Sequence, residues 1–213
     1  VAWLSASSAL FMGVALFALL NLVLLTVNGL DAYYMWVQHH LPEGVTLASF
    51  LHNSTDTLIF SILCAIAVLL FVFRGYLNFI ENNRWLKTMA YAWIAQNIWL
   101  VRTTANINWW YIQTYGLTRK RIGVYVYLLL CVIGLVSTLL KVADKKSNWF
   151  LFRKNAWAFY TVFIISCFFN WDEIIVNYNY ENYKSSQISY LDLDYETSLT
   201  YTCLGQLYKY SSA

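Results

Sequence analysis

Residues 122–140, IGVYVYLLLCVIGLVSTLL, form an apolar run without a charged side chain, and the run lies between Arg121 and Lys141. A transmembrane helix needs about 20 consecutive, mostly apolar residues. Backbone N–H and C=O groups find no water inside a bilayer, so such a run must satisfy its hydrogen bonds internally as a helix. This stretch therefore predicts a membrane-spanning α-helix.

Four further stretches have the same character, and none shows the alternation of apolar and polar residues that is typical of membrane β-barrel strands. The fold predicted is thus all-α: a polytopic integral membrane bundle of about five transmembrane helices, followed by a short polar tail. The transmembrane domain covers residues 1–171 and the extramembrane tail covers residues 172–213. The predicted helices lie near residues 9–27, 57–73, 86–104, 122–140 and 155–171.

The composition of the whole chain agrees with this class. Of its 213 residues, 60% are hydrophobic and only 12% are charged. Soluble domains carry about 25% charged residues, so this chain has too little polar surface to cover itself in water. We expect the lipid bilayer to surround it, and we expect no nucleic-acid partner.

The first apolar run begins directly at Val1, without the basic segment and small-residue cleavage site of a signal peptide. We therefore expect the chain to be part of a longer protein. Ser5, Ala9 and Gly13 follow one another at intervals of four, and small residues at this spacing let helix backbones approach closely. This pattern predicts docking of the first helix on other membrane helices or on a second copy of the chain.

The distribution of basic residues predicts an orientation. Residues 28–56 contain no Lys or Arg, whereas the 74–87 and 141–154 loops hold eight of the 14 basic residues. Cytoplasmic loops carry an excess of Lys and Arg, so we place these two loops inside and residues 28–56 outside. Alternation then leaves the basic residues between 102 and 121 outside, or this stretch is re-entrant.

The third predicted helix carries an unusual number of polar side chains. Gln96, Asn97, Arg102 and Asn108 form a candidate intramembrane polar site, because polar residues within a membrane often mark a pathway. They could line a cavity. In the alternative interpretation, which we favour, the amides bond a neighbouring helix and Arg102 extends to the headgroups.

A basic cluster marks the predicted start of the fourth helix. Gly116 is suited to end the preceding helix and Thr118 to cap the next one. Arg119, Lys120 and Arg121 then lie beside the unpaired N–H groups of the helix start, which attract anions. They form a candidate site for anions or anionic lipid headgroups. The alternative is an ordinary basic flank of a membrane helix.

The sequence predicts no catalytic residue, no metal site and no cofactor. The four cysteines form no CxxC pair, so neither a zinc site nor a disulfide framework is indicated. His39, His40 and His52 lie in one predicted loop, but a metal site needs about three or four ligands in a defined arrangement.

Several motifs resemble those of a known family. Residues 93–97, WIAQN, and 111–122, YIQTYGLTRKRI, are similar to bacterial multi-pass membrane proteins of the domain of unknown function 4153/4173 family. The YGLTxxR core at residues 115–121 is the most specific part. Further similar positions follow the last predicted helix and begin the polar tail: Asn170, Trp171, Asp172, Ile174, Ile175, Tyr178, Asn179, Asp192, Leu193 and Tyr195.

The resemblance covers most of the chain, best over residues 85–195, and residues 145–155 look most like members from the Bacteroidetes. It implies a bacterial inner-membrane location and a longer parent chain with more N-terminal helices. It implies no activity, because the family has none assigned. Residues 106–109 depart from the pattern, since we expect an arginine before an asparagine there.

Three classes of function remain open at this point. The first, which we rank ahead, is a structural or signalling membrane component that binds a partner. The second is a transporter or lipid-handling protein that uses the polar face of the third helix and the basic start of the fourth. The third is a membrane enzyme that acts on lipid-linked substrates, and overall the sequence leans against an enzyme.

Overall fold

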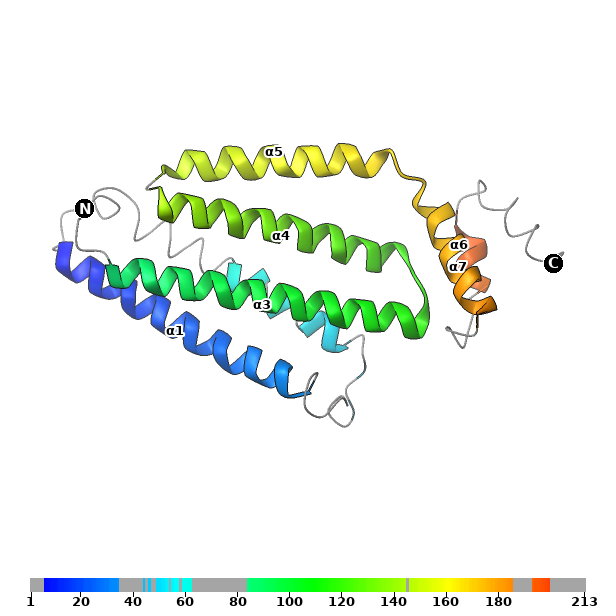
Figure 1. Ribbon diagram of the computed structural model, residues 1–213, viewed down its shortest axis with the longest axis horizontal. Helices are drawn as coiled ribbons and strands as arrows, with labels where there is room; N and C mark the ends of the chain where they lie inside the picture. The colour runs from blue at the N-terminus through cyan, green and yellow to red at the C-terminus, as the bar shows by residue number, and fades with distance from the viewer. Residues whose placement is uncertain are drawn as a thin grey trace. The chain divides into compact units, whose positions relative to one another are not determined.

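The computed structural model describes residues 6–34, 44, 46, 49–53, 55–57, 59–62, 84–144, 146–185 and 193–199. Within these ranges the structure is all-α, as predicted, and no strand is present (Figure 1). The helices are α1 (Ala6–Ala32), α3 (Arg84–Tyr115), α4 (Arg119–Ala143), α5 (Asn148–Cys167), α6 (Trp171–Lys184) and α7 (Leu193–Ser198).

Two of these helices are long and apolar enough to cross a membrane: α1, over Phe11–Ala32, and α4. Helices α5 and α6 meet at a bend of 66° and give a third candidate if they form one broken span. The described part of the chain thus has two or three candidate spans, which indicate a membrane protein. Most of the second predicted span lies outside the described residues. Its described positions, 57 and 59–62, are helical.

Helix α3 differs from the helix predicted near residues 86–104. It has 32 residues, and it is not among the candidate spans because its polar side chains lower its hydropathy. Asn97, Thr104 and Asn108 are fully buried. A helix that packs against other helices can carry such side chains, because each polar group finds a partner within the protein rather than facing lipid.

The chain forms two compact units, which are described separately. The N-terminal unit comprises residues 1–104 and 131–158, and the C-terminal unit comprises residues 105–130 and 159–213. Helices α3, α4 and α5 each contribute one part to each unit.

In the N-terminal unit, α1 and α3 run parallel (Figure 1). The Nδ2 of Asn21 donates to the Met89 carbonyl at 3.0 Å, and the Nδ2 of Asn28 donates to the Gln96 carbonyl at 3.1 Å. In each pair the two residues are 68 positions apart in the sequence, so the two helices keep a constant register from Asn21 to Asn28. The contact face of α1 consists of buried residues at steps of four and three: Phe17, Asn21, Leu24, Asn28 and Asp31.

In the C-terminal unit, α6 packs against the turn between α3 and α4. Ile175, Val176 and Leu199 are buried, and Leu117, Ile122 and Tyr195 pack against them. The Oδ1 of Asn170 accepts from the Glu173 N–H and caps α6. Asp172 and Glu173 occupy the first turn, where a carboxylate interacts favourably with the helix dipole. The start of α6 is therefore specified locally, directly after α5 ends.

Candidate functional site

The α3–α4 turn begins at a glycine that no other residue could replace without strain. Gly116 has a φ of +80°, and its N–H donates to the Ile112 carbonyl at 2.8 Å. A Cβ added at this position would lie 2.8 Å from the Oδ1 of Asn179. The turn therefore needs glycine both for its backbone conformation and for the close approach of α6.

The buried amide of Asn179 fastens this turn to α6 and α7. Its Oδ1 accepts from the Leu117 N–H at 2.5 Å, and its Nδ2 donates to the Leu117 carbonyl at 2.9 Å. The same Nδ2 donates to the Oε1 of Glu196 on α7 at 2.6 Å. One side chain thus satisfies both backbone groups of Leu117, which the turn leaves outside helical hydrogen bonding.

Arg121 is buried and serves the end of α3 rather than the start of α4. Its Nη1 donates to the Tyr115 carbonyl at 3.0 Å and also to the Gly116 carbonyl. Its guanidinium lies 4.0 Å from the centroid of the Tyr111 ring. A cation is favourable at a helix C-terminus, so the folded turn explains a basic residue that is unfavourable when α4 is considered alone.

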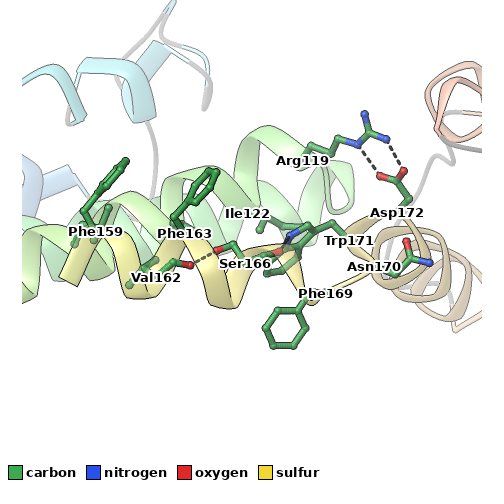
Figure 2. Close-up of a pocket in the computed structure, with 13 residues that line it drawn as sticks. Arg119, Ile122, Phe159, Val162, Phe163, Ser166, Phe169, Asn170, Trp171 and Asp172 are labelled. Carbon is green, nitrogen blue, oxygen red and sulfur yellow. Dashed lines mark hydrogen bonds and ion pairs between the residues drawn. The ribbon is translucent and has the colours of Figure 1, made fainter. Parts of the chain in front are cut away.

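Arg119 forms a bidentate ion pair with Asp172 at the start of α6. The Nε donates to Oδ1 at 2.6 Å and the Nη2 donates to Oδ2 at 2.5 Å (Figure 2). The Arg119 side chain is 53% exposed, whereas that of Asp172 is only 9% exposed. The backbone N–H of Arg119 donates to the Tyr195 hydroxyl at 2.9 Å, so the tail also contacts the start of α4.

The three basic residues predicted as one anion site therefore have different surroundings. Arg121 is committed to the carbonyl groups of the turn, and Arg119 is paired with Asp172 but remains half exposed. Lys120 is exposed. An anionic group that approached from outside would meet Arg119 and Lys120, but not Arg121. Binding of an anion here stays a prediction.

A groove with a volume of about 560 Å³ runs between α4 and α5 within the C-terminal unit. Its walls are apolar: Ile122, Val126, Leu130, Phe159, Val162 and Phe163 line it, and Gly123 forms part of the α4 wall. Figure 2 shows Phe159 and Phe163 on the same side of α5, and their rings stack with centroids 6.4 Å apart.

The polar residues of the groove gather at one end. Arg119 and Asp172 meet there, and Asn170 and Ser166 lie nearby (Figure 2). The indole Nε1 of Trp171 donates to the Ser166 carbonyl at 2.8 Å and fixes the bend between α5 and α6 beside this end. The groove is thus an amphipathic cavity that is apolar along its length and charged at one end.

The predicted intramembrane polar residues do not share one environment. In the N-terminal unit, the Nε2 of Gln96 donates to the Oδ1 of Asn21 at 2.6 Å. Asn97 is fully buried, and its Oδ1 accepts from the Ser61 hydroxyl at 3.0 Å. Both amides therefore bond another segment, as the packing alternative expects.

The other two residues of that predicted site lie elsewhere. Arg102 is exposed, and its guanidinium lies 5.7 Å from the centroid of the Trp99 ring. Asn108 belongs to the C-terminal unit, where its Nδ2 donates to the Arg121 carbonyl at 3.0 Å. A role for these four residues in a cavity stays a prediction.

Sequence analysis assigned no role to Asp172, Asn179, Tyr195 or Glu196. The first three occur in the motifs that carry the family resemblance, and this was the signal available in advance. Their partners in the turn are 53, 62 and 76 positions away along the chain. No periodicity or local spacing reports contacts over such separations.

A family model described as "Domain of unknown function (DUF4153)" matches residues 3–210 of the chain. No curated protein and no solved structure matches the chain.

Proposed function

Since this chain belongs to the DUF4153 family, we propose that it is a multi-pass membrane protein of the bacterial inner membrane and that it handles lipid. The groove between α4 and α5 would hold the lipid. The observation that carries this proposal is the amphipathic character of the groove, with apolar walls and the Arg119–Asp172 pair at one end.

The proposal includes five membrane crossings and an extramembrane tail from residue 172. Helices α1 and α3 are parallel in the N-terminal unit, so five crossings require one crossing between them, and the proposal places it near residues 57–73. Helix α4 then runs antiparallel to α3 after the turn at Gly116, and α5 reverses direction again (Figure 1).

The dimensions of the groove suit part of a lipid tail. From Ile122 to Leu130 its α4 wall is about 12 Å long, at about 1.5 Å per residue. No residue of α5 is buried, and its half after Asn155 exposes mainly apolar side chains, so this half suits a hydrocarbon environment. An acyl chain would lie along these walls, and its headgroup would meet Arg119 and Lys120.

A second function, as a structural or partner-binding membrane component, has its own support. Hydrogen bonds within the C-terminal unit hold α7 on the α3–α4 turn. Asn179 donates to the side chain of Glu196 on α7, and Arg121 donates to the Tyr115 carbonyl at the end of α3. Such a docked segment gives a partner protein a defined surface. In this alternative the groove between α4 and α5 would be filled by membrane lipid without selectivity.

A glycine that lines the groove allows a direct test. A Cβ added to Gly123 would meet no atom within 4 Å, and Gly123 lines the groove, so Gly123→Leu is chosen to fill it. Gly29 on α1 is equally open and is not in the groove, so Gly29→Leu is the matched control. The protein is purified in detergent, and retained lipid is counted by native mass spectrometry.

We expect the original chain and Gly29→Leu to retain lipid in a fixed ratio, and Gly123→Leu to lose it. Equal retention by Gly123→Leu would contradict lipid binding in the groove. Retention of every membrane lipid in proportion to its abundance would favour the structural alternative.

A further inference from the structure

Asp31 is a buried acid at the end of a candidate membrane span. It lies in the last turn of α1 and is only 6% exposed. An acid within a membrane helix is costly and often marks a functional site. The sequence placed Asp31 in an outer loop, whereas the structure places it on the face of α1 that packs against α3.

The position of Asp31 makes its negative charge more costly still. The C-terminal end of a helix carries a partial negative charge, and its last carbonyl groups have no partner within the helix. No basic residue occurs in the last turn of α1. A carboxylate here therefore adds to an existing excess of negative potential, which a cation would relieve.

A second observation comes from the neighbouring acceptor atoms. The Oδ2 of Asp31 and the Oδ1 of Asn28 are buried, and neither has a hydrogen-bond partner among the described residues. Asn28 is 7% exposed, and its Nδ2 is held by the Gln96 carbonyl, which fixes the amide plane. Residues three apart are neighbours on a helix face, so the two oxygens lie on one buried patch.

Gln96 adds a third acceptor on α3. Its Nε2 donates to the Oδ1 of Asn21, and within the described part of the chain its buried Oε1 has no hydrogen-bond partner. Buried acceptors that lack a donor cost free energy, so the interface between α1 and α3 favours a positively charged or proton-donating occupant.

The charged groups around Asp31 do not supply that occupant. The register of α1 on α3 places residue 99 opposite Asp31, because 31 + 68 = 99. Arg102 follows about one turn later on α3 and is exposed. After α1 ends at Ala32, the next titratable residues are Tyr33 and Tyr34.

We propose that Asp31 and Asn28 form a binding site for a monovalent cation, Na⁺ or a proton, at the C-terminal end of α1. An oxygen-only set with one carboxylate suits a hard cation. In membrane transporters, the C-terminal ends of helices also contribute oxygen atoms that coordinate Na⁺ or H⁺. A proton would instead convert the carboxyl into a donor for the Oδ1 of Asn28. This site is independent of the groove between α4 and α5.

The test compares Asp31→Asn with Asp56→Asn, because Asp56 is an exposed acid. Melting temperatures of the full chain in detergent are measured with NaCl or choline chloride at constant ionic strength. We expect Na⁺ to raise the melting temperature of the original chain and of Asp56→Asn, but not that of Asp31→Asn. Asn28→Leu should reduce the Na⁺ effect.

A second arm detects a proton. Without Na⁺, protonation removes the charge from a desolvated carboxylate, so lowering the pH from 8 to 6 should stabilise the original chain relative to Asp31→Asn. Asp31→Asn removes a buried charge and is expected to fold. If it responds to Na⁺ and to pH as Asp56→Asn does, the proposal is overturned.

Discussion

The amide of Asn179 pairs with both backbone groups of Leu117, with an Oδ1 to N distance of 2.5 Å and an Nδ2 to O distance of 2.9 Å. A side chain on α6 thus forms hydrogen bonds with the backbone of a turn that lies 62 positions earlier in the sequence. This relationship fixes the turn that positions Arg119 at the end of the groove. Four predictions follow from the contacts around it.

Asn179→Ala should destabilise the protein by about 2–5 kcal/mol, because buried polar groups that lose a partner cost about 1–3 kcal/mol each. The affected groups are the N–H and C=O of Leu117 and the carboxylate of Glu196. The measurement is the free energy of unfolding in detergent. Asn182→Ala is the control, because the side chain of Asn182 donates to the Tyr178 carbonyl of its own helix. Equal losses in the two variants would contradict the role given to Asn179.

Gly116→Ala should destabilise the protein by at least about 1–2 kcal/mol, the cost of a left-handed conformation for a residue with a Cβ. The contact of 2.8 Å with the Oδ1 of Asn179 would add to this loss. In contrast, Gly29→Ala lies in an open part of α1 and should stabilise that helix. Thermal unfolding of both variants measures the difference, and a Gly116→Ala variant as stable as Gly29→Ala would refute it.

The Arg119–Asp172 pair should show a coupling free energy of about 1 kcal/mol in a double-mutant cycle with Arg119→Gln and Asp172→Asn. The value is modest because Arg119 is half exposed and solvent screens its charge. The exposed pair of Lys146 and Asp144 is the control and should show a smaller coupling. Chemical denaturation provides the free energies, and a coupling near zero for both pairs would exclude a contribution of this contact to stability.

Lys120→Gln should weaken binding of the protein to vesicles that contain anionic lipid without changing its melting temperature, because Lys120 is exposed. Arg121→Gln should lower the melting temperature instead, since it removes the donor to the Tyr115 and Gly116 carbonyls. A vesicle flotation assay measures the first effect. Unchanged flotation of Lys120→Gln would remove the headgroup site from consideration.

The apolar runs in the sequence were sufficient to predict the helical class, and the family resemblance is confirmed over residues 3–210. Local signals also predicted the break at Gly116 and the cap at Thr118, whose hydroxyl accepts from the Arg121 N–H at 3.4 Å. Each of these features depends on neighbours within a few residues, so a linear pattern reports it.

The surroundings of the polar residues on α3 were harder to predict than its length. Hydropathy placed the predicted span near residues 86–104, and Gly116 marked the end of the helix, which the structure has at Tyr115. Its polar residues were compatible with a pathway or with helix packing, and the structure shows that Asn97 and Gln96 bond Ser61 and Asn21 from other segments. Whether an intramembrane amide faces lipid, water or another helix depends on packing, which composition does not encode.

The sequence by itself determined that this chain forms apolar helices and where the local caps and breaks occur, because solvation and backbone hydrogen bonding act over one helical turn. The tertiary structure alone decided the partners of the charged and polar side chains. It placed Arg121 on the end of α3, Arg119 on Asp172 and Asp31 on a buried face. These choices depend on which surfaces meet after folding, and distant residues supply those surfaces.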